Sequence, residues 1–173
     1  MDKNTVKGWM VKAEHDLEVT KHSEILPSDV VCYHAEQAAE KYLKAFLVAN
    51  DIEIKKFQIH DIDRLLVECA SIDPEFEKLS NMGIGKLTDY AIEIRYPSDY
   101  DLYDNINMPS AEETKKAISL SKTIVNFVQE KINIKLNPSK ENSKFEQETN
   151  TPKPDAFTQS LQNKPDHKIK FRR

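Results

Sequence analysis

Residues 28–52 read SDVVCYHAEQAAEKYLKAFLVANDI, and this stretch decides the fold class. Its apolar residues recur every three or four positions, which is the spacing of one face of an α-helix. Three small residues, Ala35, Ala38 and Ala39, lie at the centre of the stretch and allow another helix to approach closely. We therefore predict a long amphipathic helix packed by other helices. Its apolar stripe consists of Val31, Ala35, Ala38, Tyr42, Ala45, Phe46 and Ala49.

A second stripe of the same helix is polar. His34, Gln37, Lys41 and Lys44 recur at the same helical spacing, so they share one face. This stripe can donate hydrogen bonds, and we expect it to carry positive charge. One interpretation is a polar cleft that contacts a phosphate or a base. The other is that a neighbouring helix satisfies His34, and the sequence leaves both open.

The rest of the chain predicts four further helices and little or no strand. Ser28 or Asp29 is expected to cap the long helix, and Asp73 before a proline is expected to start a later one. Ser110 and Glu113 have the spacing of a capping box. Together these signals predict about five helices. The first two span about residues 5–21 and 28–50, and the third begins at residue 60. The fourth runs from 73 to about 95 with a break at two glycines, and the fifth runs from 110 to about 132.

Charge and apolar content divide the chain at about residue 133. Residues 134–173 hold nine Lys and Arg against five Asp and Glu, four of the eight prolines, and no sustained apolar period. This composition predicts a disordered basic tail after a helical domain at residues 1–133. The domain has a net charge of about −8. An acidic domain is not typical of a dedicated nucleic-acid platform, although the terminal KIKFRR could touch phosphate or acidic protein.

The sequence does not indicate a metal site, a cofactor site or a membrane segment. Cys32 and Cys69 lack ligand-like spacing, so we interpret them as buried thiols in a reducing compartment. His60 and Asp61 more readily order a helix start than bind a metal, because no third ligand follows at a usable spacing. We expect no metal and no cofactor. No apolar run approaches the roughly 18 residues of a membrane helix, so we expect a cytoplasmic protein without membrane contact.

The order of these segments resembles the HEPN domain, a small all-helical domain of prokaryotes. The resemblance covers about residues 4–133 and implies an all-α, up-and-down helical bundle that is often a homodimer. Family members are often encoded beside a minimal nucleotidyltransferase as a toxin–antitoxin pair. Others are metal-independent endoribonucleases, and nucleotide binding has also been proposed for the family. The matching segments are Trp9 with residues 13–17, residues 33–45, His60-Asp61-Ile62 with Leu65-Leu66, and Arg95-Tyr96-Pro97.

The ribonuclease motif of that family is an Arg and a later His with four to six residues between them. After Arg95, the position of the His is occupied by Tyr100, Asp101 or Leu102. Tyrosine titrates near 10 and aspartate near 4, so neither readily exchanges a proton at neutral pH. Arg95 also has an ordinary interpretation, in which it stabilises the C-terminal end of its helix and pairs with a nearby aspartate.

We therefore expect a non-catalytic HEPN-type module that binds a nucleotide or RNA. We expect it to form a homodimer or a larger homo-oligomer and to pair with a minimal nucleotidyltransferase. Two alternatives stay open: a ribonuclease toxin with a degenerate motif, and a structural interaction protein without a ligand. The tyrosines near Arg95 could stack on bases or pack a dimer interface. The candidate binding residues are His34, Gln37, Lys41, Arg95, Tyr96 and Tyr100.

Overall fold

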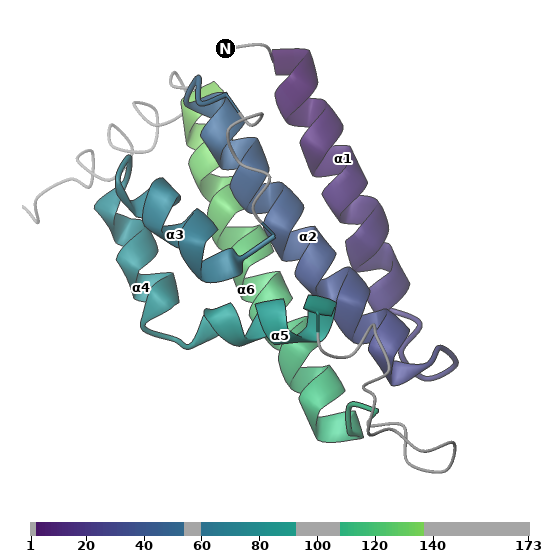
Figure 1. Ribbon diagram of the computed structural model, residues 1–173. Helices are drawn as coiled ribbons and strands as arrows, with labels where there is room; N and C mark the ends of the chain where they lie inside the picture. Colours follow the sequence, from purple (N-terminus) through teal and green to yellow (C-terminus); the bar gives the residue numbers. More distant parts are fainter. Residues whose placement is uncertain (1–2, 54–59, 93–107, 137–173) are drawn as a thin grey trace, which may run out of the picture. The chain divides into compact units, whose positions relative to one another are not determined.

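The computed structural model describes residues 3–53, 60–92 and 108–136, and these ranges are helical without strands (Figure 1). The all-α prediction is confirmed. The part of the chain that is described contains six α-helices, one more than the approximate count predicted, and two short 3₁₀ turns, η2 and η3. In chain order these elements are α1 (Lys3–Thr20), α2 (Ser28–Ala49), α3 (Ile62–Ala70), η2 (Pro74–Phe76), α4 (Glu77–Ser80), η3 (Ile84–Lys86), α5 (Leu87–Ile92) and α6 (Ala111–Leu136).

Helix α2 is the central element of the fold. It lies beside α1 and α6 over most of its length and also contacts α3 and α5 (Figure 1). Every residue of the predicted apolar stripe is buried. At Ala35 the hydroxyl of Ser121 on α6 donates to the backbone carbonyl oxygen of α2 at 2.5 Å, and both residues are fully buried. The alanine-rich face therefore admits a neighbouring helix at close range, as the sequence predicts.

Most helix starts follow the predicted capping chemistry. The carboxylate of Asp73 accepts from the backbone N–H two residues later at 3.0 Å, with Pro74 in the first turn. Asp61 accepts from the N–H three residues later at 3.2 Å. The capping box is also present, because Ser110 N–H donates to Glu113 at 2.8 Å and Glu113 N–H donates to the Ser110 hydroxyl at 3.2 Å. Each bond satisfies a donor that the first turn of a helix cannot pair internally.

Two boundaries differ from the prediction. Helix α2 begins after Pro27, which makes no side-chain capping bond, so the expected cap at Ser28 or Asp29 was wrong. Pro27 holds φ at −56°, and the two polar residues already belong to the first turn. The expected break at the two glycines is confirmed at Gly83, whose φ of +69° lies in the left-handed region that glycine tolerates. Helix α6 continues to Leu136, four residues further than expected.

The expected end of the fourth helix at Arg95 lies outside the described residues, as does most of the predicted tail. Ile132 is the last fully buried residue of α6. A domain boundary near residue 133 stays a prediction.

We expect Ala35→Leu to destabilise the fold by about 1–3 kcal/mol, because three added carbon atoms have no space between α2 and α6. Thermal unfolding followed by circular dichroism should show a melting temperature several degrees lower. Ala111→Leu is the matched control, since Ala111 is exposed at the start of α6. Equal melting temperatures for the two variants would contradict the close approach at Ala35.

Candidate functional site

Two side chains of the polar stripe of α2 contact the same carboxylate on α1, that of Asp16. Nδ1 of His34 lies 2.8 Å from Oδ1 of Asp16. Lys41 donates to the other oxygen of the same carboxylate and also to Oε1 of Gln37 at 3.1 Å. The structure thus brings together three of the predicted site residues. The side chains of His34 and Lys41 stay 29% and 22% exposed, so this corner can be reached from solvent.

Further along α2 the same network becomes buried and acidic. The amide nitrogen of Gln37 donates to Glu36 at 2.9 Å and to Glu40 at 3.2 Å. Glu40 also accepts from the buried Lys44, and Nδ1 of His60 lies 3.1 Å from its second oxygen. A continuous chain of polar contacts therefore links α1, the polar stripe of α2 and His60, which lies two residues before α3.

The positive charge expected of this stripe comes from two lysines, and carboxylates offset it. Lys41 is paired with Asp16 of α1, and Lys44 is paired with Glu40 one turn earlier on α2. Sequence reasoning missed these carboxylates. The Glu40–Lys44 pair could be predicted from sequence, because residues four apart share a helix face. The contacts of Asp16 could not, because they form only when α1 packs on α2.

Glu36 is the most perturbed carboxyl group of the network. Its side chain is fully buried, and Oε1 has no hydrogen-bond donor in the described part of the chain. Burial raises the pKa of Glu36 to about 8, the hydrogen bond from Gln37 opposes this, and the charge of Glu40 adds to it. At neutral pH the group is therefore mostly protonated beside the ion pair of Glu40.

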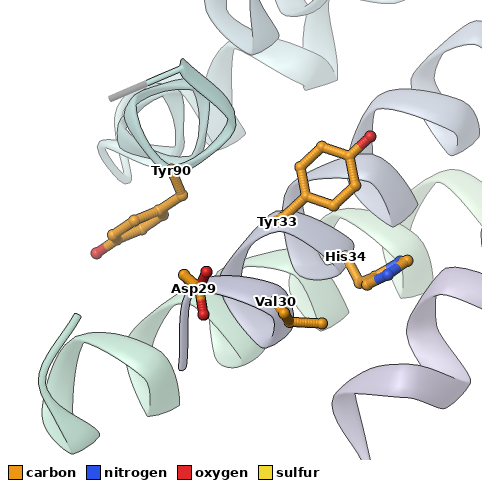
Figure 2. A pocket seen from close by; sticks show the side chains of 5 residues that line it. All are labelled: Asp29, Val30, Tyr33, His34 and Tyr90. Carbon is orange, nitrogen blue, oxygen red and sulfur yellow. The ribbon is translucent and has the colours of Figure 1, made fainter. Parts of the chain in front are cut away.

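His34 also belongs to a separate cavity at the N-terminal end of α2. The cavity has a volume of about 230 Å³ and combines α2 side chains with one from α5. In Figure 2, Tyr33 and Tyr90 lie on either side of Asp29. Oδ1 of Asp29 is buried and accepts no hydrogen bond within the described residues. The lining residues are Asp29, Val30, Tyr33, His34 and Tyr90.

The other predicted site residues, Arg95, Tyr96 and Tyr100, lie outside the described residues. Within the ranges that are described, no group of three His, Cys, Asp or Glu side chains could hold a metal ion. None of the described helices is both long and apolar enough to cross a bilayer.

Comparison with known proteins identifies the family. The family model of the HEPN domain matches residues 6–132. The chain belongs to the HEPN domain family. It is 29% identical over 141 residues to a protein of Methanocaldococcus jannaschii named "Putative toxin MJ1304", and the match covers 75% of this chain and 91% of that protein.

A solved structure supports the fold. The crystal structure of ST0689, described as an archaeal HEPN homologue, superposes with a TM-score of 0.52 and 23% identity, covering 73% of this chain and 97% of the other. At this identity the similarity establishes the helical fold of the family.

We expect Glu36→Gln to stabilise the protein at alkaline pH by an amount on the order of 2 kcal/mol. A carboxyl whose pKa is raised from 4.5 to about 8 by folding binds more protons in the folded state between these values. The free energy of unfolding of the wild type should therefore fall as pH rises through this window, and the variant should lose this dependence.

The measurement is urea unfolding between pH 5 and pH 8.5. Glu130→Gln, at an exposed position of α6, is the control and should keep the wild-type pH profile. Parallel profiles for wild type and Glu36→Gln would show that Glu36 is already ionised in the folded protein.

Proposed function

We propose that this chain is the HEPN component of a toxin–antitoxin-like pair and that it binds a nucleotide or RNA without cleaving it. Membership of the HEPN family and the similarity to a protein named as a putative toxin support the first part. The second part rests on the corner of α2 where His34 and Lys41 meet α1.

The observation that carries the binding proposal is the sharing of Asp16 by His34 and Lys41. Asp16 engages Nδ1 of the imidazole, and among the described residues Nε2 is left for a ligand. Lys41 has three N–H donors, of which Asp16 and Gln37 take two. Two polar groups are thus held in place at a partly exposed corner, so a ligand need not order them on binding.

The charge of this corner predicts how the ligand is held. Asp16 offsets the charge of Lys41, so the corner attracts a phosphate only weakly. Binding should rely on hydrogen bonds and stacking more than on counterion release, and its affinity should fall only modestly with salt. Arg95, Tyr96 and Tyr100 are proposed to complete the site with a cation and aromatic rings.

Absence of cleavage follows from the sequence after Arg95. Tyr100, Asp101 or Leu102 replaces the motif histidine, and general acid–base help is typically worth about 10² to 10⁴ in rate. One observation favours the second candidate, a ribonuclease. The Asp16–His34 contact holds an imidazole in one orientation, as a general base in RNA cleavage requires.

The proposed protein partners are a second copy of the chain and a minimal nucleotidyltransferase. A small nucleotidyltransferase encoded next to this chain would support the pairing, and a purely structural role gains if none is found and no ligand binds.

We expect labelled single-stranded and structured RNA to stay intact with the protein in the absence of metal, while RNA or nucleotide binds measurably. Lys41→Met and Arg95→Ala should each weaken binding roughly tenfold, because each removes a hydrogen bond to a charged or polar ligand. Fluorescence anisotropy gives the affinity and gel electrophoresis detects cleavage. Lys116→Met, at an exposed position of α6, is the matched control.

The outcomes separate the candidates. Robust cleavage that His34→Ala abolishes would establish the ribonuclease and overturn the non-catalytic proposal. Intact RNA with no binding of RNA or nucleotide would favour the structural interaction protein.

We also expect a mass of at least twice 20.0 kDa by light scattering at tens of micromolar. Helix α1 presents exposed Gly8 and Val11 beside the half-buried Trp9, so part of its outer face is apolar or small. A second copy packed there would remove this surface from water. A monomer at these concentrations would rule the homodimer out.

A further inference from the structure

The cavity at the N-terminal end of α2 combines two aromatic rings with a carboxylate. Tyr33 comes from α2 and Tyr90 from α5, and in Figure 2 they lie on either side of Asp29. Oδ1 of Asp29 is buried and receives no hydrogen bond within the described residues. Asp29 nevertheless lines the cavity, so its carboxylate is the acidic group of the cavity wall.

The electrostatic surroundings of the cavity are negative. Burial raises the pKa of Tyr90, and the carboxylates of Glu113 and Asp89 add to the effect. Burial also raises the pKa of Cys32, which Thr114 opposes and the carboxylates of Glu113 and Asp29 increase. Carboxylates from α2, α5 and α6 thus act on the same region, and residues 1–133 as a whole are acidic. Such a field favours a cation and disfavours a phosphate.

We propose that this cavity binds the guanidinium group of an arginine side chain presented by a partner protein. A guanidinium is planar and permanently charged, stacks on aromatic rings, and donates two parallel N–H bonds to a carboxylate. The aromatic rings of Tyr33 and Tyr90 suit the stacking, and the carboxylate of Asp29 suits the positive charge. The inference rests on the proposed pairing with a partner protein and names the chemistry of that contact.

A guanine base is the main competitor, because its edge also offers two adjacent N–H donors and its ring also stacks. A nucleotide, however, brings phosphate charge close to the carboxylates of Asp29, Asp89 and Glu113. The positive charge of an arginine is instead attracted by the same carboxylates. An ammonium group is attracted by the same carboxylates, but it lacks the planar shape that stacks on aromatic rings.

The test uses N-acetyl-arginine-methylamide as the probe and the citrulline analogue as its neutral isostere. In ¹H–¹⁵N NMR titrations of the full chain, arginine should shift the amide signals of the first turns of α2 and of Tyr90. The citrulline analogue should bind at least about tenfold more weakly, because it lacks the charge. Asp29→Asn should weaken arginine binding by a similar factor, and Tyr90→Leu should weaken it severalfold while keeping an apolar wall.

Asp63→Asn, at an exposed position of α3, is the matched control and should leave arginine binding unchanged. Circular dichroism establishes that each variant is folded. Equal affinity for arginine and citrulline, unchanged affinity in Asp29→Asn, or no binding of arginine would overturn the proposal. Tighter binding of guanosine monophosphate than of arginine at these signals would assign the cavity to a nucleotide instead.

These outcomes are distinguishable from those of the RNA experiment. Lys41→Met tests the Asp16 corner and leaves Asp29 intact, whereas Asp29→Asn leaves the Asp16 contacts intact. Loss of the arginine shift with unchanged RNA affinity would remove this inference alone.

Discussion

Burial of α2 on nearly all sides is the constraint on which the rest of the structure depends. Because α1, α6, α3 and α5 all contact this helix, its polar side chains have little access to water. A buried charged group must find a partner or change its protonation state. Lys44 and Glu40 form an ion pair one turn apart. Glu36 stays mostly neutral because burial raises its pKa. The polar stripe is half-buried at His34, Gln37 and Lys41 and buried at Lys44.

This enclosure limits where a ligand can bind. In the described residues, the polar side chains of α2 that keep solvent access include His34 and Lys41 and those at the Asp29 cavity. The first corner is close to electrically neutral, and the second is negative. The two therefore suit different ligands, although His34 belongs to both. Phosphate recognition, if present, depends on cations outside this stripe, of which Arg95 is the proposed one.

The parts of this fold that could be predicted from sequence are those set by local rules. The apolar stripe of α2 follows from helical spacing, and the caps at Asp61, Asp73 and Ser110 follow from short-range hydrogen bonding. The cap of α2 was mispredicted because a proline preceded two plausible capping residues.

The site was harder to predict because its partners are distant in sequence. His34 and Lys41 were identified as candidates, but Asp16 is 18 and 25 residues away from them and joins them only through the packing of α1 on α2. Tyr90 likewise meets Tyr33 only because α5 packs on α2. Helical spacing places side chains on a face and says nothing of what covers that face. The carboxylates that offset the lysines of the polar stripe were missed for this reason.

His34 is shared by the two candidate sites, and this has a consequence for any partner. One side of the imidazole contacts Asp16, and the same residue lines the cavity of Asp29 and Tyr90. A partner that inserted an arginine into the cavity would place a positive charge beside His34. It would also restrict access to the corner where Lys41 lies. Partner binding and ligand binding would then oppose one another at this end of α2, which is the relationship that a toxin and its antitoxin require.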